Sequence, residues 1–154
     1  MKLLHSNQLS AFGGAHFVFE YFDQLGLDGI LGQHLPKLRP PSTYSWKDIL
    51  YAINSIFYCG GDCMEDLHSL KAHFEGTPHF IMPSPDTPLR RMRQLAVEDQ
   101  TCRTKRGSVD HTYNFNEPMS RLNMAILNKL GAFEGEIILD YDNTLLFTEK
   151  KDSR

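Results

Sequence analysis

The stretch SWKDILYAINSIFYC, residues 45–59, decides the fold class of this chain. Ser45 is a preferred N-cap residue, and the apolar residues after it recur at helical spacing rather than at alternate positions. The expected apolar stripe comprises Trp46, Ile49, Leu50, Ile53, Ile56 and Phe57. A stripe of this width is typical of a helix that buries one side, so we expect these side chains to lie in a helical core.

The sequence before this stretch predicts a pair of helices. Apolar residues over 9–35 again follow helical spacing, Gly26 is placed to end a first helix, and Asp28 can cap a second one. The proline-rich segment 36–41 cannot be helical throughout. The stretch at 45–59 is therefore preceded by two helices and an irregular connection.

The sequence after this stretch predicts more helices. Gly60 and Gly61 interrupt the pattern, and Asp62 can cap a helix that runs to Gly76. The segment 83–88 predicts a turn in which Asp86 or Thr87 caps a helix and Pro88 occupies an early position. The remaining expected elements are a helix over 89–96, a polar stretch over 98–114, and a helix over 117–130 that ends at Gly131.

The last part of the chain carries a different pattern, EIILDYDNTLLF at residues 136–147. An apolar run of strand length brings Asp140 and Asp142 to one face, because side chains alternate along a strand. The segment 142–144 is a plausible turn into a second strand over 145–148. We therefore expect a mainly α chain, with a helical domain over 1–131 and the beginning of a sheet over 132–154.

Composition limits the classes of protein to which the chain can belong. Its 154 residues, 41% apolar and 23% charged, suit a soluble globular protein with its own core. We find neither an apolar run long enough for a membrane helix nor a signal peptide, so we expect no membrane partner. The three cysteines cannot all pair, which agrees with a reducing compartment. We therefore expect a cytoplasmic protein. The net charge of −3 excludes a general polycation, so any contact with nucleic acid must be local.

One segment of the sequence has a local excess of positive charge. The cations are Arg90, Arg91, Arg93, Arg103, Lys105 and Arg106, with Glu98 and Asp99 among them. A helix entered through a tight turn is how helix-turn-helix proteins present a reading head, and these cations can neutralise DNA phosphates. The alternative is a solvated helix face followed by a loop. Lys37 and Arg39 are too scattered in the sequence to add to the predicted contact.

Cys59, Cys63, His68 and His73 have side chains that can bind a metal ion. Their spacing is not that of a compact zinc finger or knuckle, and Gly60 and Gly61 interrupt the helix between them. We therefore interpret them as small apolar cysteines and surface histidines.

Three motifs together resemble the amino-terminal part of bacterial insertion-sequence transposases of the DDE type. They are SPDTPLRR at 84–91, ILDYDNT at 138–144 and FTEKKDS at 147–153. The resemblance implies a helical DNA-binding domain, followed by the first β-hairpin of an RNase H-like α/β domain. It also implies double-stranded DNA at transposon ends as a partner, in DNA transposition and recombination. A second copy of the chain is a further potential partner.

The resemblance also implies a catalytic role for one aspartate. In that family the first strand supplies the first of three metal-binding acids, an Asp followed within two residues by Ser or Thr. Asp142 fits this pattern and Asp140 is the second choice, with Mg²⁺ or Mn²⁺ as the ion in a complete catalytic domain. The other two acids lie well beyond the first strand in those enzymes, whereas this sequence ends at Arg154. We therefore expect the chain alone to be inactive, as a truncated product or fragment.

Two alternatives stay open from the sequence. The segment DYDNTL at 140–145 also resembles the first motif of haloacid-dehalogenase-like phosphatases, in which Asp140 would be the nucleophile and Asp142 a general acid/base. That motif normally opens its domain, whereas here a long helical region precedes it. The other alternative is a helical DNA-binding or assembly module without chemistry.

Overall fold

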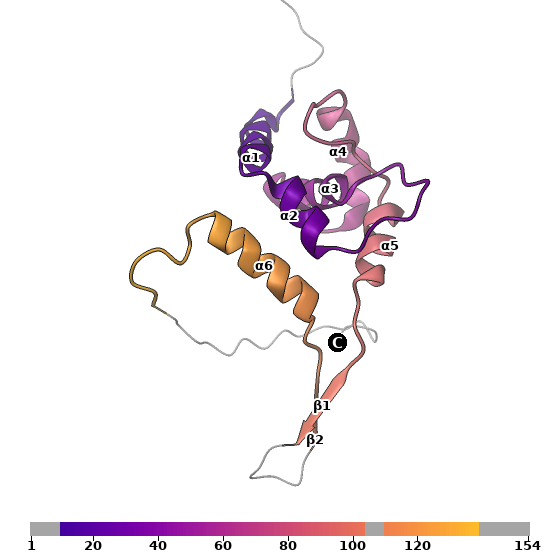
Figure 1. The fold of residues 1–154 in the computed structure, drawn as a ribbon. Coiled ribbons are helices and arrows are strands. Elements are labelled where there is room, and N and C mark those ends of the chain that lie inside the picture. Colours follow the sequence, from indigo (N-terminus) through magenta and orange to yellow (C-terminus); the bar gives the residue numbers. More distant parts are fainter. Residues whose placement is uncertain (1–9, 104–109, 139–154) are drawn as a thin grey trace, which may run out of the picture.

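The computed structural model describes residues 10–103 and 110–138. Within them the chain is mainly helical with one small antiparallel sheet, which confirms the predicted class (Figure 1). The elements in order are α1 (Gly13–Gln24), α2 (Leu27–His34), α3 (Trp46–Tyr58), the 3-10 turn η1 (Met64–Asp66), α4 (Leu67–Phe74), α5 (Asp86–Gln94), β1 (Gln100–Arg103), β2 (Asp110–Tyr113) and α6 (Glu117–Lys129). None of these helices is long and apolar enough to cross a membrane.

Helix α3 is the central element of the core. It packs against α1, α2, α4 and α5, and α6 packs on α2 at the outside of the bundle (Figure 1). An aromatic cluster fills the space beside α3, with Phe19 stacked on Tyr51 at a centroid distance of 5.0 Å and Phe80 at 5.1 Å from Phe19. Phe19 and Tyr51 are fully buried, so the core depends on contacts between segments that are remote in the sequence.

The structure confirms the start of α3 but corrects part of its expected stripe. Trp46 and Ile49 are buried as expected, whereas Phe57 is 72% exposed, so its predicted place in the core is wrong. The residues that share its side of the helix, Leu50 and Ile53, are only partly buried. The fully buried arc instead includes Tyr51, Ala52 and Ser55. The hydroxyls of Tyr51 and Ser55 can be buried because they donate to Asp23 and to the Ala52 carbonyl. The spacing of apolar residues does not reveal such hydrogen bonds.

Several helix ends also differ in detail from the sequence-based expectation. Gly26 ends the first helix with φ 71°, but Asp28 lies inside the first turn of α2 and does not cap it. The predicted cap at Asp62 is replaced by Asp66, whose Oδ2 accepts from the backbone N–H groups of Asp62 and Cys63 at 2.8 and 3.1 Å. Helix α5 begins at Asp86 with Pro85 at its N-cap, so it lacks the expected side-chain cap.

The polar stretch between α5 and α6 forms a hairpin that was not expected from the sequence. Strands β1 and β2 pair antiparallel, with Gln100 opposite Tyr113, and the hairpin extends away from the helical body (Figure 1). Its base is held by Asn116, whose side-chain amide donates to the Leu95 carbonyl at 2.6 Å while its Oδ1 caps α6 at the Met119 N–H. One side chain therefore joins the end of α5 to the start of α6.

The described chain includes only the start of the expected active-site strand. Residues 136–138 have no regular secondary structure, and Ile138 is 85% exposed. Asp140, Asp142 and the expected second strand over 145–148 lie outside the described residues. The RNase H-like hairpin therefore stays a prediction.

Candidate nucleic-acid interface

Helix α5 presents a positively charged outer surface. Its inner side is fixed by buried Thr87 and Pro88 and by Met92, which packs against the core. Arg90 and Arg93 are exposed. Asp86 in the first turn is the helix's acidic residue, so its later turns carry only positive formal charge. An amphipathic helix of this kind can pack on the body and still offer arginines to a polyanion.

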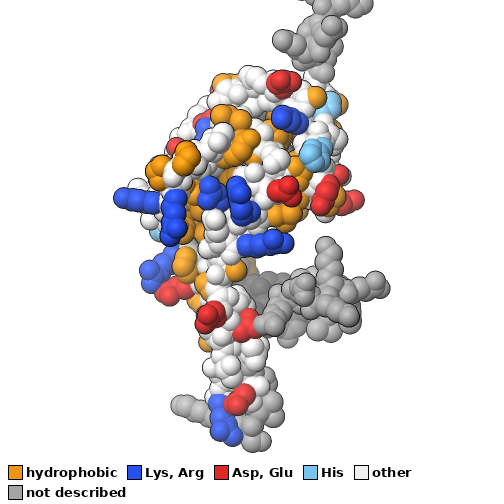
Figure 2. All heavy atoms as spheres, turned by 90° about the vertical axis from the view of Figure 1, so that its right-hand side faces the viewer, with side chains coloured by type: hydrophobic (Ala, Val, Ile, Leu, Met, Phe, Trp, Pro, Cys, Tyr) orange, Lys and Arg blue, Asp and Glu red, His pale blue; other side chains and the backbone are white. Residues whose placement is uncertain are grey.

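A second segment brings further cations to the same face. Lys37 and Arg39, in the connection after α2, line one hollow of about 430 Å³ together with Arg91 of α5. None of the described residues that line this hollow is acidic. Figure 2 shows lysine and arginine side chains gathered over this side of the molecule. The structure therefore places Lys37 and Arg39 beside Arg91, from which they are remote in the sequence.

We use the name cationic face for the hollow cations Lys37, Arg39 and Arg91 together with the exposed arginines of α5, Arg90 and Arg93. Linear spacing could not reveal it, because α2 and α5 are joined by the helices of the core. The sequence showed the clustering of Arg90, Arg91 and Arg93, and separately the proximity of Lys37 to Arg39, but not that the two groups belong together.

Hydrogen bonds fix the two walls of the hollow against each other. The Trp46 indole N–H donates to the Pro36 carbonyl at 2.8 Å, which holds the segment before α3 on the helix itself. The Arg91 guanidinium donates to the Ser42 Oγ at 3.0 Å through Nη2, and to the Gln94 Oε1 at 3.0 Å through Nη1. The position of the Arg91 guanidinium is thus set before any ligand arrives.

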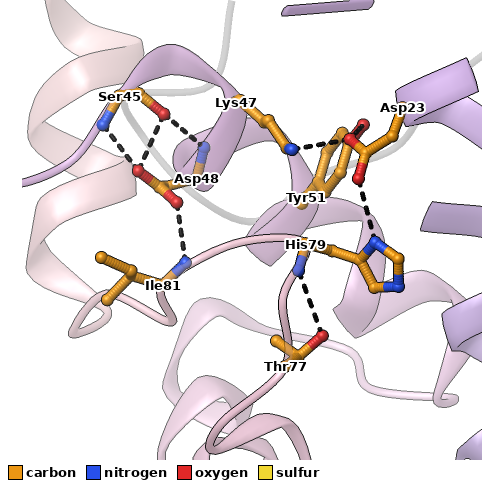
Figure 3. A network of polar contacts seen from close by, with 8 residues as sticks. All are labelled: Asp23, Ser45, Lys47, Asp48, Tyr51, Thr77, His79 and Ile81. Atoms are coloured by element: carbon orange, nitrogen blue, oxygen red, sulfur yellow. Dashed lines mark hydrogen bonds and ion pairs between the residues drawn. The ribbon is translucent and has the colours of Figure 1, made fainter. Parts of the chain in front are cut away.

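A buried carboxylate, Asp48, connects the elements that carry the hollow (Figure 3). Its Oδ2 accepts from the Ser45 N–H at 2.7 Å and from the Ser45 hydroxyl at 2.8 Å, while Oδ1 accepts from the Ile81 N–H at 2.7 Å. Ser45 follows the segment with Lys37 and Arg39, and Ile81 lies on the segment that leads into α5. Asp48 therefore acts as a clamp that positions both walls.

A second polar network lies around Asp23 and holds α1 to α3 and to the segment before α5 (Figure 3). The carboxylate contacts the Lys47 Nζ at 2.6 Å, the Tyr51 hydroxyl at 2.8 Å and the His79 Nδ1 at 2.9 Å. Burial raises the pKa of Asp23, but the hydrogen bonds from Lys47, His79 and Tyr51 outweigh this effect, so its pKa lies below the ordinary value of 3.8.

The same network gives Tyr51 a structural rather than a chemical role. Burial, and then the hydrogen bond to the Asp23 carboxylate and its charge, raise the pKa of Tyr51. The phenol is therefore protonated and fully buried, which makes it a donor to Asp23 and not a nucleophile.

The other predicted DNA contacts are not placed together with α5. Arg103 lies at the end of β1, is 67% exposed in its side chain, and contacts Asp110 at 3.8 Å. Lys105 and Arg106 lie outside the described residues. The structure thus unites Arg90, Arg91 and Arg93 on one helix and puts Arg103 on the hairpin.

The metal-capable residues do not form a ligand set in the described part of the chain. Within residues 10–103 and 110–138, no group of three or more His, Cys, Asp or Glu side chains is placed to hold a metal ion. Burial raises the pKa of Cys59, which disfavours the thiolate form that binds zinc. Asp140 and Asp142, the predicted magnesium ligands, are outside these ranges.

The route into α5 differs from that of a helix-turn-helix motif. Such a motif joins its two helices by a turn of about three or four residues, whereas α4 ends at Phe74 and α5 begins at Asp86. α4 and α5 are therefore not a helix-turn-helix pair, although the chain enters α5 through a turn in which the Thr87 N–H donates to the Ser84 carbonyl at 3.0 Å. The chain matches no protein-family model, and comparisons with curated proteins and with solved structures give no match either.

Proposed function

We propose that the helical body binds double-stranded DNA through the cationic face. The observation that carries this proposal is the convergence of cations from two remote segments on one side of a chain whose net charge is −3. Charge separation of this kind favours a local polyanionic partner, because each neutralised phosphate releases condensed counterions.

The arrangement also suggests how the contact is divided. Arg90 and Arg93 are exposed on α5 and can reach phosphates along a duplex, while Arg91 is held at the hollow between the two segments. Lys37 and Arg39 extend the contact beyond the helix. The short α5 thus contributes to a broader phosphate-binding surface, and base readout is not required for its affinity.

We further infer that the chain is the amino-terminal part of a DDE transposase that binds transposon-end DNA. The support is the resemblance of the motifs at 84–91 and 138–153 to that family. In a complete catalytic domain, Asp142, with Asp140 as the second choice, would supply the first acid for phosphodiester hydrolysis and strand transfer with Mg²⁺ or Mn²⁺. The described residues offer no ligand set for such an ion, so we assign no catalytic step to it.

The DNA-binding proposal is tested by the salt dependence of duplex binding. Replacing Arg90 and Arg93 by Gln should weaken binding and reduce the slope of log K against log salt by about 0.9 for each phosphate that is no longer neutralised. The matched control replaces Arg121 and Lys129 of α6 by Gln, which removes the same charge from another helix. A slope that changes equally in both variants, or in neither, would remove α5 from the interface.

The transposase assignment needs a separate experiment. A protein that continues beyond residue 154 with further acids should nick transposon-end DNA in the presence of Mg²⁺, and Asp142→Asn should abolish the nicking. Turnover of a small phosphate ester that depends on Asp140 would instead support the phosphatase alternative. Duplex binding without either activity would favour the module without chemistry.

A further inference from the structure

We propose that the hollow between Lys37, Arg39 and Arg91 is a binding site for a single nucleotide, with its phosphate held by Arg91. This inference rests on the proposed function for the source of the nucleotide, which is a strand of DNA. It goes further in assigning one defined pocket, rather than a diffuse charged surface, to one chemical unit of the ligand.

Arg91 has hydrogen-bond donors that no described residue uses. A guanidinium has five N–H donors, and two of them are used by Ser42 and Gln94. The Arg91 Nε is buried and has no hydrogen-bond partner among the described residues. A buried, unpaired donor is unfavourable, and a phosphate oxygen is the acceptor that best fits the planar fork of an arginine.

The lining of the hollow is positively charged. Lys37 and Arg39 add two positive charges to that of Arg91, and the described lining contains no carboxylate to neutralise them. A phosphate diester or monoester therefore gains favourable interactions with three cations at one place. Because Arg91 is already held in place by Ser42 and Gln94, binding costs less conformational entropy than it would for a mobile side chain.

The hollow has room for more than a phosphate, and part of its lining is apolar. The volume of the hollow, about 430 Å³, lies in the range of small-molecule sites. This volume is larger than a phosphate group alone would fill. Pro36, Leu38 and Trp46 form the apolar part of the lining. Since the Trp46 indole N–H is already bonded to Pro36, Trp46 offers mainly carbon surface. In a nucleotide, the phosphate can contact the cationic side chains while the sugar and the base contact the apolar ones. Inorganic phosphate can contact only the cationic side chains.

The experiment measures binding of thymidine 5′-monophosphate, thymidine and inorganic phosphate to the full chain by calorimetry. The monophosphate should bind more tightly than either of the other two. Arg91→Lys keeps the charge but removes the planar fork of N–H donors. It should weaken binding of the monophosphate by about tenfold. The matched control Arg121→Lys, an exposed position on α6 outside the hollow lining, should change the affinity for the monophosphate less than about twofold. Lys37→Gln, at an exposed position, should also weaken binding and gives a second variant with little risk to folding.

A competition arm identifies the source of the nucleotide. Duplex DNA should raise the apparent Kd of the monophosphate, and independent binding of the two would overturn DNA as the source. Equal affinity for inorganic phosphate and the monophosphate would overturn the nucleotide assignment. Duplex binding with no binding of the monophosphate would overturn the assignment of the hollow as a nucleotide site and would leave the proposed DNA binding unaffected. Monophosphate binding that depends on Arg91, without any duplex binding, would support the hollow and overturn the proposed function.

Discussion

Replacement of Asp48 by Ala should destabilise the helical body and also weaken anion binding at the hollow. The Asp48 carboxylate is buried and accepts three hydrogen bonds, two from Ser45 and one from the Ile81 N–H. Alanine accepts none of them. The variant therefore loses the capping box at the start of α3 and the connection to the segment that leads into α5.

The size of the effect follows from these hydrogen bonds. Loss of a helix cap costs about 1 kcal/mol, and loss of a hydrogen bond to a charged group costs about 1.5–3 kcal/mol. Ser45 is exposed, so water can replace part of what its hydroxyl and N–H lose. We expect the free energy of unfolding to fall by about 3 kcal/mol, a large part of the roughly 5–15 kcal/mol that stabilises a typical domain.

Urea unfolding followed by far-ultraviolet circular dichroism measures this change. The control is Asp86→Ala, an exposed acid in the first turn of α5 that makes no side-chain cap, which should cost only about 0.3–1 kcal/mol through the helix dipole. The midpoint of Asp48→Ala should fall well below that of the control at an unchanged m-value. Equal midpoints for the two variants would show that the hydrogen bonds of Asp48 do not stabilise the helical body.

The remaining predictions address the core, the acid response and the base of the hairpin. Phe19→Ala should cost about 3–5 kcal/mol in urea unfolding, whereas Phe57→Ala should cost less than about 1 kcal/mol because its ring is 72% exposed; similar losses would contradict the observed burial. Since the pKa of Asp23 is lowered by folding, its ionisation stabilises the protein above pH 3.8, and this contribution is lost as the pH falls through the lowered value. Asp23→Asn should therefore be less stable near neutral pH and show a flatter decline in acid, and parallel stability curves would exclude this role. Asn116→Ala should cost about 1–2 kcal/mol by removing the α6 cap and the bond to the end of α5, and a hydrogen-exchange experiment should show faster exchange at the first turn of α6; unchanged protection there would contradict it.

Local sequence signals predicted the helices but not their packing. The Ser45 cap, the break at Gly26 and the end of the last helix at Gly131 depend on a few neighbouring residues, so they could be predicted. The burial of Tyr51 could not, because its partner Asp23 lies on another helix. Phe57 was misplaced for the same reason, since apolar spacing does not say which side of a helix is covered by neighbours.

In the candidate site too, the local part could be predicted and the contacts between remote segments could not. The arginines of α5 are consecutive or nearly so in the sequence, and their shared helix was predicted. Lys37 and Arg39 join them only through the fold, which brings the segment after α2 beside α5. The hairpin between α5 and α6 was missed because its short strands are polar and exposed, and they lack the alternation that indicates a buried strand.

Duplex binding by a Lys37→Gln, Arg39→Gln double variant tests whether the two remote segments form one DNA-binding surface. The variant leaves α5 intact and removes only the cations contributed by the other segment. We expect weaker binding and a salt slope reduced by about 0.9 for each phosphate that these two side chains neutralise, compared with an unchanged slope for the Arg121→Gln, Lys129→Gln control on α6. A slope equal to that of the unmodified protein, with duplex binding retained, would show that the segment with Lys37 and Arg39 does not bind DNA and that α5 acts without it.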